Sequence, residues 1–238
     1  MNRHARPFTA PNPSVTQNSV DLRTSFGRFS TFEALLNCMT DQREMLKQNV
    51  AKFVTLTEDQ LDYFLSHLHE HSFKKGQVLL SEGERVDKEY FVLSGCLKAF
   101  FINDEGRMLI MQFAMPDWWT SDYTALYNNT RASINIDCIT DATVLSLSGS
   151  DREKMCCEVR AIEHFFRLRS NRGYIASQRR LLSMMNNDTK SRYEELMRSY
   201  PELYNTVPKH LIAAYLGVSR ETLSRLYGNH ALSHQSKM

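Results

Sequence analysis

The chain has 238 residues, of which 42% are hydrophobic and 24% charged, and its formal net charge is +2. This length allows one large domain or two smaller ones, and the composition is typical of a soluble globular protein. The longest apolar runs, such as Tyr90–Leu93, are too short to cross a bilayer, and no apolar stretch follows the N-terminal charges. We therefore expect a cytoplasmic protein with no membrane partner.

The cysteines do not form a metal-binding or redox motif. They are an odd, scattered set without a Cys-x-x-Cys pair: Cys38, Cys96, Cys138, Cys156 and Cys157. We expect reduced thiols, with the adjacent Cys156 and Cys157 as two buried small residues. His67, His69 and His71 alternate where a helix passes to a strand, and we interpret them as solvated surface rather than as metal ligands. No metal site is predicted.

The first third of the chain changes from polar to helical. Residues 1–30 hold three prolines among Asn, Ser and Thr, which predicts a disordered extension. Residues 31–157 should form a helical lead-in followed by a β-barrel. In the lead-in, apolar residues recur at helical spacing from Phe32, and Thr57 is placed to cap a helix that begins at Glu58.

Short apolar runs punctuated by glycine follow from about residue 75. The strands we predict are Gln77–Ser81, Glu89–Leu93, Leu97–Asn103, Met108–Phe113, Ala132–Ile139 and Thr143–Ser148. Asn103-Asp104-Glu105-Gly106 is a suitable hairpin turn, because Asn, Asp and Gly tolerate positive φ. Strands at this close spacing indicate a compact antiparallel barrel or sandwich.

Residues 158–187 form a long helix in this interpretation. Leu168, Ile175 and Leu182 fall seven apart, with Phe165 and Met185 on the same stripe. A narrow apolar seam of this kind packs against a copy of itself or against the barrel of its own chain. From residue 159 to 187 there are six arginines and one acid, which suits a phosphate-rich partner or a solvated helix face.

Residues 188–230 are predicted to be a separate small helical domain, followed by a tail at 231–238. The stretch 209–226 meets the demands of a helix-turn-helix. Ala213 is small, midway along the first helix; Gly217 suits a turn with positive φ; Ser219 can cap the second helix. The shared core would consist of Ile212, Leu216, Val218, Leu223 and Leu226. An αα-hairpin that does not bind DNA is the alternative.

The polar residues of the second helix fall on the face opposite Leu223 and Leu226. Arginine can pair bidentately with guanine, and glutamate can accept a hydrogen bond from cytosine. Base contacts are made at the N-terminal end of a recognition helix. The residues we expect to read bases are Arg220, Glu221 and Arg225. Those expected to hold phosphates are Ser219, Thr222 and Ser224.

From about Leu56 to Tyr227, the chain resembles the cyclic-AMP receptor / fumarate-nitrate regulator (Crp/Fnr) superfamily. The matching stretches are residues 75–83 (KGQVLLSEG), 90–95 (YFVLSG) and 217–225 (GVSRETLSR). The last is the most specific, and its Arg220, Glu221 and Arg225 correspond to the base-reading residues of the family's cyclic-AMP receptors. The chain is most similar to a subgroup common in Bacteroidetes.

The resemblance implies an α+β fold: an N-terminal cyclic-nucleotide-binding-like antiparallel β-barrel (a jelly roll), a long dimerisation helix and a C-terminal helix-turn-helix domain. It implies a homodimer that reads a palindrome in double-stranded DNA, with half-sites similar to TGTGA, and RNA polymerase as a further partner. A regulator of this type is not an enzyme, and the sequence shows no nucleophile elbow or metal-ligand spacing.

The effector cassette departs from the family's pattern. Cyclic-nucleotide-binding members have Gly-Glu for the ribose and Arg-Ser or Arg-Thr for the phosphate. Here Gly-Glu is missing, Asp122 lies near its place, and Arg131 is followed by Ala132 and then Ser133. Trp118 and Trp119 would fill the barrel core or stack on a different ligand. The candidate effector residues are Arg131, Ser133, Trp118, Trp119 and Asp122, and we expect a different effector or none in place of cyclic AMP.

Two further departures concern iron–sulfur chemistry and the C-terminus. The family's iron–sulfur sensors carry clustered N-terminal cysteines, and only Cys38 lies in that region, so no cluster is expected. Residues 228–238 are too short and polar for the β-hairpin wing that usually follows the recognition helix. The missing wing keeps an alternative open, a ligand-binding sensor or scaffold with little or no specific DNA binding.

Overall fold

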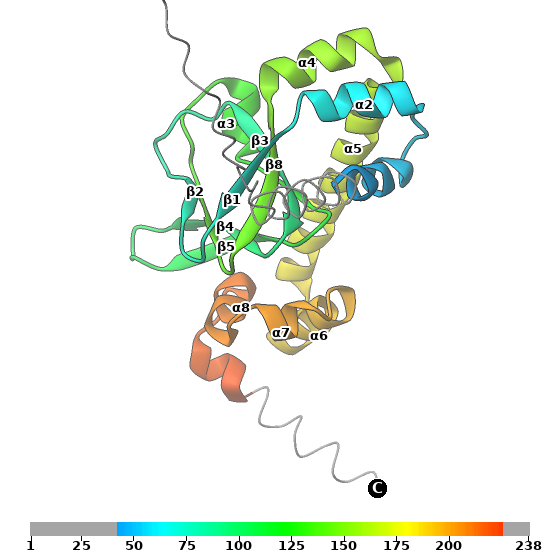
Figure 1. Cartoon of the computed structure of the whole chain (residues 1–238). Helices are drawn as coiled ribbons and strands as arrows, with labels where there is room; N and C mark the ends of the chain where they lie inside the picture. The colour runs from blue at the N-terminus through cyan, green and yellow to red at the C-terminus, as the bar shows by residue number, and fades with distance from the viewer. Residues whose placement is uncertain (1–41, 226–238) are drawn as a thin grey trace, which may run out of the picture. The chain divides into compact units, whose positions relative to one another are not determined.

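The computed structural model describes residues 42–225, and its first part is built from two four-stranded antiparallel sheets (Figure 1). The strand orders are β1-β8-β3-β6 and β2-β7-β4-β5. The strands are β1 His69–Phe73, β2 Val78–Leu80, β3 Lys88–Ser94, β4 Leu97–Ile102, β5 Met108–Ala114, β6 Trp119–Thr120, β7 Asn135–Cys138 and β8 Ala142–Ser148. The predicted α+β fold with an antiparallel β-barrel is confirmed.

Both sheets are covered on both faces by apolar side chains. Between the sheets, Val92 and Val144 pack with Leu97 and Ile136. On the outer face of the first sheet, Phe91 packs with side chains of the surrounding helices. A strand buried on two faces contains consecutive apolar residues rather than an alternating pattern. This burial explains why the runs in β3 and β4 could be recognised from the sequence.

The six predicted strands correspond to β2, β3, β4, β5, β7 and β8. The predicted hairpin turn is also confirmed, because the Asn103 side chain accepts hydrogen bonds from the backbone of Glu105 and Arg107, and Gly106 has φ of 75°. Two strands were not predicted. In the described part of the chain, β1 is a polar edge strand that pairs with β8 alone, and β6 has just two residues. Neither contains enough apolar residues to give a periodic signal.

Helices surround the sheets and continue beyond them. A helix covers residues 42–51, and the labelled helices are α2 Glu58–Ser66, α3 Tyr123–Asn128, α4 Gly149–Glu158, α5 Arg160–Asn186, α6 Thr189–Ser199, α7 Leu203–Thr206 and α8 Lys209–Leu216. The predicted cap of α2 is present as a capping box, in which Thr57 and Gln60 bond each other's backbone N–H. None of the helices among residues 42–225 has the length and apolarity needed to span a membrane.

The long helix α5 changes character along its length. Its first turns are buried, with Ile162, Phe165 and Phe166 packed on the barrel. Its second half is mostly exposed. The predicted apolar stripe therefore divides: Phe165 packs against the chain's own barrel, whereas Ile175 and Leu182 are 46% and 52% exposed.

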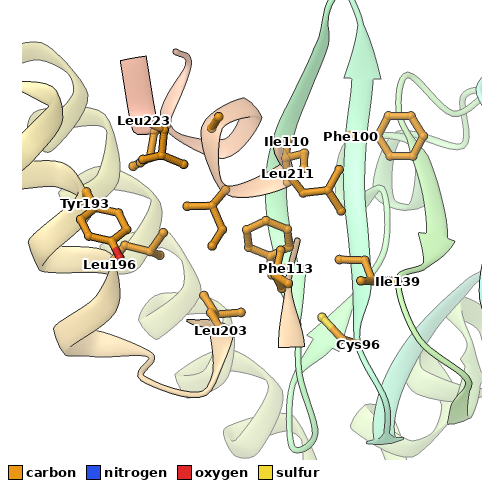
Figure 2. Close-up of a cluster of buried hydrophobic side chains, with 14 of the residues drawn as sticks. Cys96, Phe100, Ile110, Phe113, Ile139, Tyr193, Leu196, Leu203, Leu211 and Leu223 are labelled. Carbon is orange, nitrogen blue, oxygen red and sulfur yellow. The ribbon is translucent and has the colours of Figure 1, made fainter. Parts of the chain in front are cut away.

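The C-terminal helices pack on the outer face of the second sheet (Figure 2). Phe113 of β5 lies close to Leu211 of α8, and the Phe113 and Tyr215 rings stack with centroids 5.2 Å apart. Arg180 of α5 connects the second sheet with the C-terminal helices, because its guanidinium donates hydrogen bonds to the carbonyls of Met111 and Ile110 in β5 and of Tyr215 in α8. β5 is the edge strand of its sheet, and these bonds give its carbonyls a partner.

The expected N-terminal extension (1–30), Cys38, Leu226 and the C-terminal stretch 228–238 lie outside the described residues.

Candidate DNA-binding helix-turn-helix and effector region

Helix α8 and the helical residues 220–225 form the predicted helix-turn-helix. Gly217 ends α8 in the left-handed conformation with φ of 70°, and the N–H of Val218 reaches back to the carbonyl of Ala213 at 3.0 Å. Ser219 caps the second helix, its Oγ accepting a hydrogen bond from the backbone N–H of Thr222 at 3.2 Å. The predicted turn at Gly217 and the predicted cap at Ser219 are thus confirmed by local geometry, and the phosphate contact of Ser219 stays a prediction.

The apolar residues of the motif point to one common core. Ile212, Ala213, Leu216 and Leu223 are each buried, and all belong to the cluster drawn in Figure 2. Val218 is partly buried at its edge. This burial fixes which side of the second helix faces away from the domain.

The opposite side of the second helix is exposed and polar. Exposed residues on it are Ser219, Arg220, Glu221, Ser224 and Arg225, and Thr222 is half-buried. The pKa of Glu221 is lowered by hydrogen bonds from its own backbone N–H and from Ser219, so that Glu221 is a charged acceptor at neutral pH. Ser219 and Thr222 are partly engaged with each other, their hydroxyls lying 3.2 Å apart. Arg220 and Arg225 are exposed, and neither takes part in these hydrogen bonds.

The two tryptophans of the effector region have separate environments. Trp119 is buried at 8% exposure; its ring packs 5.0 Å from that of Phe91, and its Nε1 donates to Asn49. Trp118 packs edge-on against Tyr200 of the C-terminal helices, at 4.8 Å. The structure therefore gives each tryptophan a protein partner, which agrees with the core interpretation and places them on no common ligand platform.

Asp122 and Ser133 are brought together at the start of the short helix α3, and Arg131 lies apart from them. The buried Asp122 carboxylate caps α3 through the N–H of Ala125 at 3.0 Å, and it accepts hydrogen bonds from the N–H and Oγ of Ser133 at 2.8 and 2.9 Å. Burial by itself raises the pKa of Asp122, but these hydrogen bonds outweigh it and lower the pKa. Arg131 is exposed and donates to the carbonyl of Gly83 at 2.8 Å. Asp122 and Ser133 are thus paired with each other, whereas Arg131 bonds a backbone carbonyl.

A buried charge cluster beside this region was not predicted. Glu89 of β3 lies between two arginines, with Arg169 Nη2 at 2.5 Å from Oε2 and Arg152 Nε at 3.7 Å from Oε1. The Tyr123 hydroxyl donates to the same carboxylate at 3.3 Å, and Arg169 also stacks over the Trp119 ring. The cluster connects β3, α3, α4 and α5. A charged residue within the otherwise apolar run of β3 was its one sequence signal.

No metal site is present among residues 42–225, since no three His, Cys, Asp or Glu side chains gather there. The predicted burial of the adjacent cysteines is wrong in part. Cys156 is half-buried. Cys157 is exposed, because it lies on the outer side of α4. His71 bonds Ser146 at 2.9 Å on the edge strand β1.

Fold and site together define a class of protein: a two-sheet β-barrel domain, a long connecting helix and a helix-turn-helix with an exposed polar face. The family model for the cyclic nucleotide-binding domain matches residues 70–158. The anaerobic regulatory protein of Haemophilus influenzae is 28% identical over 189 residues, covering 73% of this chain and 72% of that protein. By these two matches, the chain is similar to regulators of the Crp/Fnr superfamily.

One further curated protein and one solved structure are similar to this chain. The cAMP-activated global transcriptional regulator CRP of Salmonella typhimurium is 28% identical over 57 residues, so the match covers 24% of this chain and 27% of that protein. The c-di-GMP responsive global regulator CLP of Xanthomonas campestris has the same fold, with a TM-score of 0.59 at 14% identity over 75% of this chain and 93% of that one. The similarity to a Bacteroidetes subgroup stays a prediction.

Proposed function

We propose that this protein is a homodimeric transcription regulator that binds a palindromic DNA site through residues 219–225. The observation that carries the proposal is the exposed face with Arg220, Glu221 and Arg225, held by a capped helix whose opposite side is buried. These are the side chains suited to read guanine and cytosine edges in the major groove. The protein acts by binding rather than by catalysis.

The dimer would form along the second half of α5. Five large apolar side chains on one side of this helix are between 46% and 73% exposed, and they recur at helical spacing: Tyr174, Ile175, Leu181, Leu182 and Met185. An exposed apolar stripe of this kind marks an interaction surface. A second copy of the same helix fits it, because a two-fold axis along the stripe would bury both faces and hold two recognition helices for two half-sites.

DNA binding is expected without a cyclic nucleotide. The Asp122 carboxylate uses the N–H groups of Ala125 and Ser133 and the hydroxyl of Ser133. A cyclic phosphate is an anion, and in this arrangement it would meet donors that are already engaged and a carboxylate of the same charge. The internal bonds therefore support a barrel that holds its shape without this effector.

The test begins with selection of binding sites from a random duplex library by the full-length protein. We expect an enriched palindrome, and fluorescence anisotropy at fixed salt should show the same affinity for it with and without cyclic AMP. Arg220→Ala and Arg225→Ala should each lose about 1–3 kcal/mol on the selected duplex and much less on a scrambled one. Arg198→Ala removes an exposed charge from α6 and serves as the control.

Two results would contradict the proposal. If no palindrome is enriched, specific DNA binding fails and the sensor or scaffold alternative takes its place. If affinity appears only with cyclic AMP, the argument from Asp122 is wrong. Equal losses for Arg220→Ala on selected and scrambled duplexes would assign that residue to phosphate contact.

A further inference from the structure

A cavity of about 220 Å³ lies where α5 meets α6 and α8. It is separate from the effector cassette and from the exposed face of the second helix of the helix-turn-helix. Three of the side chains that line it are arginines: Arg179 and Arg180 from α5 and Arg192 from α6. The one carboxylate in the wall, Glu195, accepts a hydrogen bond from Ser183 at 2.7 Å. The cavity therefore carries an excess of positive charge.

These arginines have no carboxylate partner within residues 42–225. Arg180 is half-buried and donates to three backbone carbonyls, and its guanidinium lies 4.0 Å from the centre of the Tyr215 ring. Burial lowers the pKa of Arg180, and the Tyr215 group is the one opposing influence. A cation taken out of water without a counter-charge is unfavourable, so an anion placed here would be stabilised.

Arg192 lines the cavity from α6. Its Nη2 donates to Thr189 at 3.3 Å, and its Nε is fully buried with no hydrogen-bond partner among residues 42–225. Buried N–H groups are nearly always paired, so this unpaired donor leaves the positive charge of the guanidinium incompletely compensated. Arg179 adds a second guanidinium, which is exposed and makes no ion pair or hydrogen bond with the described residues.

The rest of the wall is apolar and aromatic. Tyr200 and Tyr215 line it together with Met184, Leu196 and Leu216. A small cavity with convergent cations and aromatic surface suits a compact ligand that has one ring and one anionic group. The volume is too small for a ligand with several large groups.

We propose that this cavity binds a small aromatic anion, a phosphate or carboxylate on a single ring, between α5 and α6. The anion lies between Arg179 and Arg192, and the ring contacts Tyr200 and Tyr215. Such a ligand holds α6 and α8 against α5. Its effect on DNA binding rests on the proposed function, because α8 leads through Gly217 directly into the recognition helix.

The test is calorimetric titration of the full-length protein with phenyl phosphate, without DNA. We expect phenyl phosphate to bind at least tenfold more tightly than inorganic phosphate or benzyl alcohol, since both the charge and the ring are used. Arg192→Gln should weaken it about tenfold or more, and Arg179→Gln several-fold. The matched controls Arg198→Gln on α6 and Arg172→Gln on α5 remove the same charge outside the cavity and should leave affinity unchanged.

Hydrogen exchange locates the phenyl phosphate site independently of the titration. Phenyl phosphate should slow exchange of the backbone amides of α6 and α8 and leave those of β1 unchanged. Urea unfolding of Arg192→Gln shows whether that variant still folds, and Arg179→Gln repeats the test at an exposed position. Equal affinity for phenyl phosphate and inorganic phosphate, or equal loss in a variant and its control, overturns the proposal. Absence of DNA binding would contradict the proposed function and leave this result intact.

Discussion

Replacing Glu89 by glutamine tests the buried charge cluster that connects the barrel with the long helix. The Glu89 side chain is 1% exposed, and its partners Arg169 and Arg152 are 12% and 16% exposed. Glutamine keeps the shape and one acceptor but removes the charge, which leaves two buried guanidinium groups without a counter-ion. Removing one partner of a buried pair costs about 3–5 kcal/mol.

We expect a value near the lower limit, about 3 kcal/mol, because the pairing is imperfect in the native protein. Among residues 42–225, Glu89 Oε1, Arg152 Nε and Arg169 Nη1 all lack a hydrogen-bond partner, so part of the possible stabilisation is absent before the substitution. The measurement is the free energy of unfolding by urea, compared between the wild type and Glu89→Gln.

The control is Glu105→Gln. Glu105 pairs with Arg107 at 3.3 Å, but the two side chains are 66% and 76% exposed, and exposed pairs contribute about 0–1 kcal/mol. A double-mutant cycle with Arg169→Met isolates the Glu89–Arg169 term. A loss below about 1 kcal/mol for Glu89→Gln, equal to that of the surface control, would refute the argument that this cluster is effectively desolvated.

Four further outcomes follow from the packing. Gly95→Ala should lower the free energy of unfolding in urea by about 3 kcal/mol or more, because at φ of +87° a Cβ would lie 2.2 Å from the Asp141 carbonyl oxygen. Gly106→Ala should lower it by about 1 kcal/mol, because φ there is also positive, at +75°, but a Cβ would meet no neighbour. Ile175→Glu should convert the dimer to a monomer in sedimentation velocity, because a charge would enter the apolar stripe. Arg180→Met should lose about 2 kcal/mol and speed hydrogen exchange in α8, since hydrogen bonds and a cation–π contact are removed. Asp122→Asn should lower the free energy of unfolding by about 1–2 kcal/mol at pH 7. Because the pKa of Asp122 is lowered in the folded protein, its carboxylate stabilises the fold above pH ~4, and this stabilisation is lost as the pH falls through the folded pKa.

Each of these expectations has a contradicting result. Equal costs at Gly95 and Gly106 would mean that the close approach to Asp141 is absent. A wild type that sediments as a monomer removes the dimer along α5. Unchanged exchange in α8 after Arg180→Met would show that the apolar cluster alone holds the C-terminal helices. A constant difference between Asp122→Asn and the wild type from pH 7 down to pH 2 would assign the loss to packing instead of charge.

The sequence determined the local features of this protein. Thr57, Asp188 and Ser219 cap helices through bonds to residues three positions later, and Gly217 turns the chain with a positive φ. Such signals depend on neighbours in the chain, so they can be read without the fold. The same holds for the runs of consecutive apolar residues in β3 and β4. The exposed face of the recognition helix followed from helical periodicity alone.

The tertiary structure decided which distant groups meet. Asp122 and Ser133 are 11 positions apart in the chain, and Glu89 and Arg169 are 80 apart. Trp118, next to strand β6, contacts Tyr200, which follows helix α6. Nothing local distinguishes the buried Arg169 from the exposed Arg172 three positions on. A charge acquires its role from the partners and burial that packing gives it, because desolvation and Coulomb energies depend on distances in space and not on separation along the chain.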